Sequence, residues 1–182
     1  MGIGADFERC IAGGGIAVFP SDTVYGLACD PDNPTAVARM YALKGRALDK
    51  PAAVMRFALD DLPPLEPRTE AAAGRLLPGP VTVVVGSLGL RVPDVPLLRG
   101  VRVAVLQTSA NHAGGPDVRC LEDVPADIRA GADLVIDGGE LPGTPSTVVD
   151  LTRFEDTGEW AILREGALSS DRLRALLGGS SS

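Results

Sequence analysis

The chain has 182 residues, of which 45% are hydrophobic, so it is long enough for one substantial core but not for two comfortable domains. Its net charge of -7 argues against a nucleic-acid binder that works by neutralising phosphates, because that contribution grows with the cations presented. The three cysteines are odd in number, widely spaced and in no CxxC pair, so they support neither a disulfide framework nor a zinc site, and a reducing cytoplasm fits best.

Helix and strand signals follow one another irregularly along the chain. In chain order they predict a helix over 6–12, a strand over 16–19, a helix over 34–44, a strand over 52–57, a helix over 69–77, strands over 81–85, 88–92 and 101–107, a helix over 122–130, strands over 134–137, 147–151 and 160–163, and a helix over 170–177. The clearest is the helix that has Asn33 as N-cap, Pro34 at its first position and Gly45 as its C-terminal glycine.

Strands outnumber helices in this prediction, and many connections are too short for a regular crossover helix. We therefore expect an α+β fold (an irregular α/β arrangement) in which helices flank a twisted mixed sheet, and not a doubly wound parallel sheet. A single domain is predicted over residues 1–177, followed by a flexible Gly/Ser tail over 178–182. No secretion signal and no apolar stretch of membrane-spanning length is found, so a cytoplasmic protein without membrane contact is expected.

The two lysines of the chain fall in one short stretch, whereas its fifteen arginines are spread widely. Lys44, Arg46 and Lys50 place three cations within seven residues, which suits a polyphosphate ligand. A solvated turn that happens to keep the last lysines of an arginine-rich chain is the alternative interpretation. Other parts of the sequence must decide between the two.

The sequence contains no GxxxxGK[ST] phosphate loop, no GxGxxG fingerprint and no GxSxG nucleophile elbow. The single histidine, His112, cannot build a histidine-rich metal site, and covalent catalysis is not expected. Polar clusters instead stand where strands end, at residues 20–27, 107–111, 145–147 and 164–166, a common place for ligand sites. Each cluster taken alone could also be an ordinary hydrogen-bonded turn.

Taken together and in order, these clusters resemble the YrdC-like L-threonylcarbamoyl-AMP synthases over nearly the whole chain. The segments that carry the resemblance are residues 20–27, 43–46 with 50–51, 77–82, 91–93, 108–111, and 146–150 followed by 162–166. The resemblance implies a twisted sheet around a concave basic cavity, where ATP, bicarbonate and L-threonine give threonylcarbamoyl-adenylate and pyrophosphate for tRNA modification. It also implies Mg²⁺ carried by the phosphates, no metal ligands from the protein, and a separate tRNA threonylcarbamoyl-transferase complex as possible partner.

The resemblance also implies roles for particular residues, by motif position. Catalysis is assigned to Lys44 and Arg46. Nucleotide binding is assigned to Arg46, Lys50, Ser109, Asn111 and Arg164. Threonine binding is assigned to Thr23, Tyr25 and Ser146. Ser109 and Asn111 lie two positions apart, so on an extended segment they would face one side and reach one ligand together.

The physical chemistry of the residues agrees with that reaction. The attacking groups belong to the substrates, so a site without a catalytic Ser, Cys or His is expected, and the protein must supply alignment and positive charge. We expect Lys44→Ala and Arg46→Ala each to abolish turnover and leave folding intact, on the premise that both cations are exposed at a helix end.

Two alternatives belong to other classes. A non-catalytic RNA-binding or ribosome-associated module would also need a basic cavity, but the net charge and an aromatic content of 4% predict weak or absent tRNA binding. A carbamoyl-adenylate enzyme related to hydrogenase maturation is ranked lower, because the chain has no zinc-finger or acylphosphatase-like segment. The chain departs from the resembled family in short connectors after Val85 and near 95–101, and in having Ala113 where a serine is common.

Overall fold

The computed structural model describes residues 2–47 and 52–178 of the chain. Within this part, nine strands form one sheet in the order β7-β1-β2-β6-β3-β5-β4-β8-β9. The strands are β1 (Ala17–Pro20), β2 (Tyr25–Cys29), β3 (Ala53–Met55), β4 (Val81–Val85), β5 (Leu88–Arg91), β6 (Val105–Ser109), β7 (Leu134–Val135), β8 (Thr147–Asp150) and β9 (Ala161–Arg164). The α-helices are α1 (Ile3–Ala12), α2 (Pro34–Lys44), α3 (Pro67–Leu76), α4 (Ala126–Gly131), α5 (Phe154–Thr157) and α6 (Ser170–Leu177).

The sheet is mixed, as the sequence predicts. Strand β7 pairs with β1, β3 with β5, and β4 with β8 in parallel, whereas the other neighbouring pairs are antiparallel. Helices and short 3₁₀ turns (Leu59–Asp61, Pro96–Leu98 and Leu121–Asp123) connect the strands. The predicted α+β class is therefore confirmed. All described strands share one sheet, which favours the proposed single domain.

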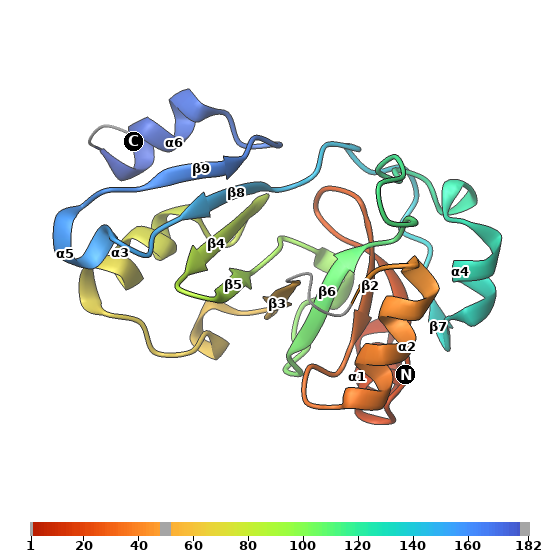
Figure 1. Ribbon diagram of the computed structural model, residues 1–182. Coiled ribbons are helices and arrows are strands. Elements are labelled where there is room, and N and C mark those ends of the chain that lie inside the picture. The colour runs from red at the N-terminus through yellow and green to blue at the C-terminus, as the bar shows by residue number, and fades with distance from the viewer. Residues whose placement is uncertain (1, 48–51, 179–182) are drawn as a thin grey trace.

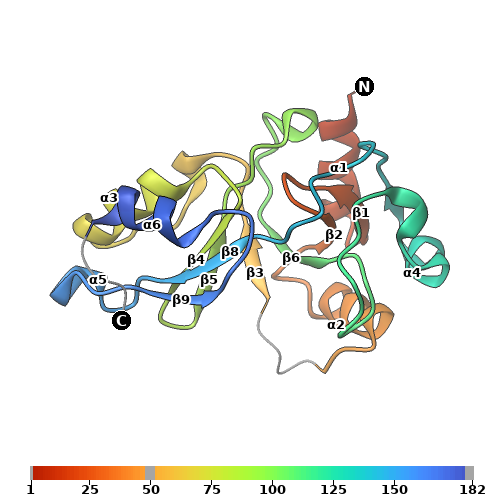
Figure 2. The same ribbon diagram turned by 90° about the horizontal axis from the view of Figure 1, so that it is seen from above.

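The helices divide between two halves of the molecule (Figure 1). Strands β4, β5, β8 and β9 lie with α3, α5 and α6, whereas α1, α2 and α4 gather around the half that contains β2 and β6, and the view from above shows the same division (Figure 2). One apolar core joins α3 and α6 to the first half. Two further cores cover opposite faces of the second half, one beneath α2 and α4 and the other beneath α1.

Helix α2 begins and ends where the sequence predicts. The Asn33 side-chain oxygen accepts hydrogen bonds from the backbone N–H groups of Thr35 and Ala36, each at 3.1 Å, and Pro34 follows. Gly45 ends the helix in the left-handed conformation with φ 59°, which glycine adopts without steric cost. This end places Lys44 on the last helical turn and Arg46 just beyond it.

Some elements differ from the prediction. Strand β2 was not predicted, and its first residues belong to the polar cluster 20–27. All five of its residues are buried, so it lacks the polar alternation that marks a half-exposed strand. Strand β6 begins at Val105 and not at Val101, because Val101 packs into the core beneath α1 from an irregular segment. The short helix α5 was not predicted.

No described helix combines the length and the apolar character that crossing a membrane requires. Of the predicted tail, residues 179–182 lie outside the described part of the chain, as does the predicted nucleotide-binding residue Lys50.

Candidate functional site

A cavity of about 650 Å³ lies against one face of the sheet and takes its lining from both halves. Strand register explains its floor: Val84 lies opposite Gly89, and Ala53 lies opposite Gln107, while a Cβ at Gly89 would stand 3.5 Å from the Ala53 Cα. Gly89 and Ala53, the two small residues, therefore lie in the middle of one row of residues across the sheet. Because these side chains are small, they leave space above the sheet. The cavity volume of about 650 Å³ suits a ligand of nucleotide size.

The cavity is basic. Three arginines line it, Arg46, Arg91 and Arg164, and Asp117 is the only acidic residue among the described lining residues. Arginine presents a planar fork of donors that matches phosphate and carboxylate groups. The charge and the donor geometry therefore favour an anionic ligand, although the whole chain is acidic.

Lys44 is buried, with 3% of its surface exposed, and so is not the exposed helix-end cation that the sequence predicts. Its ammonium nitrogen donates to the backbone oxygens of Ser109 at 2.6 Å and Asn111 at 2.7 Å, and to the Asn111 Oδ1 atom at 2.9 Å. An ammonium group has three N–H donors, so these bonds use all of them. Lys44 fastens the end of α2 to the segment that follows β6.

Asn111 is held from both ends of its amide. Its Oδ1 atom also accepts from the Ser109 hydroxyl at 2.6 Å, and its Nδ2 atom donates to the backbone oxygens of Gly115 at 2.8 Å and Pro116 at 2.9 Å. Ser109 and Asn111 thus come together, as predicted, but they bond to each other and to Lys44. With Arg46 and Gly114 they line a second cavity of about 410 Å³ that shares Arg46 and Ser109 with the first.

Arg46 is half-buried where the two cavities meet. Its Nη1 atom donates to the Thr108 hydroxyl at 3.1 Å, and its guanidinium carbon stands 5.7 Å from the centre of the Tyr41 ring. A hydrogen bond and a cation–π contact restrict the guanidinium, so less conformational entropy remains to be lost when it binds a ligand.

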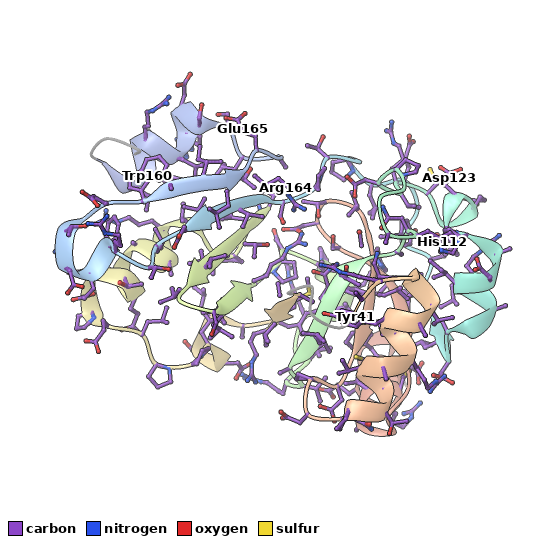
Figure 3. The ribbon with its side chains drawn as sticks, viewed as in Figure 1. Tyr41, His112, Asp123, Trp160, Arg164 and Glu165 are labelled. Atoms are coloured by element: carbon purple, nitrogen blue, oxygen red, sulfur yellow. The ribbon has the colours of Figure 1, made fainter. Side chains whose placement is uncertain are left out.

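Arg164 and Ser146 meet at the wall formed by β8 and β9. The Arg164 Nη2 atom donates to the Ser146 backbone oxygen at 2.7 Å and to its hydroxyl at 3.2 Å, and that hydroxyl lies 3.0 Å from the Thr82 hydroxyl. Figure 3 places Arg164 at the end of β9, in the half opposite Tyr41 and His112. The structure therefore brings these two predicted site residues together and to the cavity.

Arg91 is a cavity residue to which the sequence analysis assigned no role. It is 3% exposed, and its Nη2 atom donates to the Asp22 carboxylate and, at 2.6 Å, to the Thr23 hydroxyl. Its Nε atom is buried and has no hydrogen-bond partner among the described residues. The available signal was its position at the end of an apolar strand, in the segment 91–93 that already carried the family resemblance.

Thr23 and Tyr25 are not among the cavity-lining residues. Thr23 is fully buried, and its hydroxyl is engaged by Arg91 and, at 2.9 Å, by the Ser21 hydroxyl. Tyr25 is also fully buried, and its hydroxyl donates toward the Gly139 backbone oxygen at 2.9 Å and accepts from the Gly138 N–H at 2.9 Å. Thr23 thus supports Arg91 from behind, and Tyr25 supports the loop after β7.

Metal-ligating side chains do not gather in the described chain: it has no group of three or more His, Cys, Asp or Glu residues that could hold a metal ion. Asp117, on the cavity wall, is the described carboxylate that could face a cation carried by a bound ligand.

Comparison with known proteins identifies the fold and the family. The Sua5/YciO/YrdC family model, described as telomere recombination, matches residues 9–166. A threonylcarbamoyl-AMP synthase from Chromohalobacter salexigens is 33% identical, and the match covers 83% of this chain and 94% of that protein.

Longer relatives match as well. A threonylcarbamoyl-AMP synthase from Pyrococcus abyssi is 29% identical over 91% of this chain and 54% of its own length, so this chain spans about half of that relative. The crystal structure of P. abyssi Sua5 complexed with L-threonine superposes with a TM-score of 0.82 at 26% identity, over 95% of this chain and 56% of that one. With the family model matched over most of its length, this chain belongs to the Sua5/YciO/YrdC family.

Proposed function

We propose that this chain is an L-threonylcarbamoyl-AMP synthase, a nucleotidyltransferase that forms threonylcarbamoyl-adenylate and pyrophosphate from L-threonine, bicarbonate and ATP. The observation that carries the proposal is the match with the C. salexigens synthase, which extends over 94% of that protein. The product would serve threonylcarbamoyl-adenosine formation in tRNA by a separate transferase complex in the cytoplasm. The relatives named as synthases favour this enzyme over the RNA-binding alternative.

The site suits a reaction in which the substrates supply the nucleophiles. The threonine amine attacks bicarbonate and gives a carbamate with loss of water, and a carbamate oxygen then attacks the α-phosphorus of ATP and releases pyrophosphate. The protein has to align three substrates and to stabilise the charge that develops on the phosphates. The basic cavity supplies donors for both tasks, from Arg46, Arg91 and Arg164.

The arrangement of the cavity suggests how the ligands divide it. The nucleotide phosphates lie at the junction of the two cavities, where Arg46 contacts them and Lys44, a largely buried lining residue of the smaller cavity, adds its charge. Arg164 and Ser146 bound the same space from the opposite wall. Arg91, held by Asp22 and Thr23, faces the carboxylate of threonine. Asp117 is the acidic residue of the described lining that could face Mg²⁺ carried by the phosphates, which would neutralise part of their charge.

Pyrophosphate release by the purified protein tests the proposal. With ATP, Mg²⁺ and bicarbonate, we expect release that requires L-threonine and that L-serine supports poorly. Arg46→Ala should lower kcat by about 10²–10³-fold, as loss of a charge-stabilising donor typically does, with the unfolding midpoint near that of the wild type. Arg39→Ala, which removes an exposed arginine paired with Asp133, is the matched control and should keep full activity. A wild-type protein that binds ATP and releases no pyrophosphate with any amino acid would contradict the assignment.

Nucleotide affinity should depend on pH through Lys44. Burial, with a further contribution from the neighbouring Arg46 charge, lowers the pKa of Lys44 to about 8. The protonated form attracts the phosphates, so ATP affinity should fall as pH rises through about 8, by up to about tenfold per pH unit. Calorimetric titration with ATP between pH 7 and 9 measures this effect. The same titration with Lys44→Met should be nearly flat in that interval, and an equal slope in both proteins would disprove the role of Lys44.

A further inference from the structure

The side-chain amide of Gln107 is the unexplained polar group of the cavity floor. Gln107 lies in β6, lines the larger cavity and is 6% exposed. Within the described part of the chain, its amide has no hydrogen-bond partner. Its amide atoms are not among the fully buried side-chain atoms that lack a partner, so they are accessible from the cavity. The amide borders the cavity, where a ligand can satisfy it.

The neighbouring strand makes room for this amide. A Cβ atom added at Gly26 would stand 2.9 Å from the Phe19 ring, closer than real Cβ atoms come, and 3.0 Å from the Gln107 Nε2 atom, which is a tight contact. A larger residue at position 26 would therefore displace the Phe19 ring or the Gln107 amide. Gly26 thus lets the amide lie close to β2, which limits its position on the floor, as a recognition group requires.

Gln107 lies between the two polar regions that the proposed reaction has to connect. The next residue, Thr108, holds Arg46 at the phosphate side. On the other side, Met55 lies opposite both Val105 and Arg91, so Arg91 belongs to the row next to that of Gln107. The one-carbon unit must lie between these regions, because its carbon bonds to the threonine amine and one of its oxygens then bonds to the α-phosphorus.

The chemistry of a primary amide fits that carbon unit. Bicarbonate is planar and presents an O–H donor beside an O⁻ acceptor, and the carbamate made from it presents an N–H donor beside an O⁻ acceptor. A glutamine amide offers one N–H donor beside one carbonyl acceptor, so two parallel hydrogen bonds can form with either species. The hydrogen bond from the amide N–H to the O⁻ can therefore persist while the amine attacks the carbon, and the amide carbonyl exchanges the O–H of the departing water for the N–H of the carbamate.

We propose that the Gln107 amide binds bicarbonate, and then the carbamate, in the cavity. This assignment rests on the proposed synthase activity and adds a recognition group for the one-carbon substrate. The Gln107 side chain contributes hydrogen bonds only and does not act as an acid or a base. It acts by holding the carbon unit in the plane that exposes it to the threonine amine.

Two substitutions at Gln107 test the proposal by steady-state pyrophosphate release in CO₂-free buffer with added bicarbonate. Gln107→Met keeps the length of the side chain and removes both hydrogen bonds, so the KM for bicarbonate should rise about tenfold while those for threonine and ATP change less than twofold. Gln107→Glu places a negative charge against the anion and should raise the bicarbonate KM further. Arg39→Ala, which lies outside both cavities, is the control and should leave the bicarbonate KM unchanged.

The outcomes distinguish a failure of the Gln107 assignment from a failure of the synthase assignment. An active wild type with an unchanged bicarbonate KM in Gln107→Met would overturn the Gln107 assignment and leave the synthase assignment standing. A rise in the threonine KM alone would overturn it too, because the amide would then recognise the amino acid. A wild type without threonine-dependent release would remove the synthase assignment and this one with it. The unfolding midpoint of Gln107→Met should match or exceed that of the wild type, which excludes misfolding as the cause.

Discussion

Replacing Lys44 by methionine is expected to lower the free energy of unfolding by about 2–4 kcal/mol, because it leaves buried acceptors without their donor. Methionine fills a similar volume, so packing is largely kept, but the backbone oxygens of Ser109 and Asn111 lose their hydrogen bonds to the ammonium. For a chain of this length the loss corresponds to a fall in Tm of roughly 5–15 °C. Thermal or urea unfolding measures it directly.

The matched comparison is with Arg46→Ala, two residues further on. Arg46 is half-buried and bonds to a hydroxyl that can turn to other partners, so its loss should cost about 1 kcal/mol or less. Both variants should lose activity, but only the lysine variant should lose much stability. If Lys44→Met unfolded at the wild-type temperature, the three hydrogen bonds of the ammonium would not stabilise the fold. The expectation from the sequence, that the fold stays intact without Lys44, would then hold.

The elements that the sequence predicts well are those with local signals. Helix α2 has its cap at Asn33, its first-position proline and its closing Gly45 within one segment, and the structure reproduces all three. Strand β4 and helix α6 also match their predicted bounds. Strand β2 lacks such a signal because both of its faces are buried, so its residues do not alternate between polar and apolar.

The site was predictable to the extent that its residues lie in short motifs. Lys44 and Asn111 lie in two different motifs and meet in space. Their burial depends on contacts between residues 67 positions apart, which no local pattern shows. Arg91 and Gln107 were missed for the same reason: the Asp22 partner of Arg91 is 69 residues away, and the room for Gln107 comes from Gly26 on another strand. Spacing along the chain identifies which residue types are present, and strand register decides which of them face the cavity.

Replacing Arg91 by methionine should be the most destabilising change at the site. The free energy of unfolding should fall by about 3–5 kcal/mol, because a buried carboxylate is left without its counter-ion. The side chains of Arg91 and Asp22 are 3% and 9% exposed, and their ion pair is supplemented by the Thr23 hydroxyl. Without the guanidinium, Asp22 keeps the Asp94 N–H, at 3.3 Å from its Oδ2 atom, but loses its opposite charge. Urea unfolding of the variant measures the loss.

A double-mutant cycle with Asp22→Asn isolates the ion pair from the rest of the cost. Asp22→Asn removes the charge and keeps the shape, so the arginine variant should do less damage in that background, with a coupling of at least about 1 kcal/mol. Additive losses would mean that Arg91 stabilises the wall by packing alone. The cycle also tests function. In Asp22→Asn the guanidinium stays in the cavity but loses the opposite charge that orients it, so the threonine KM should rise while the ATP KM holds. An unchanged threonine KM would show that Arg91 does not contact the amino acid, since its orientation would then be irrelevant to binding.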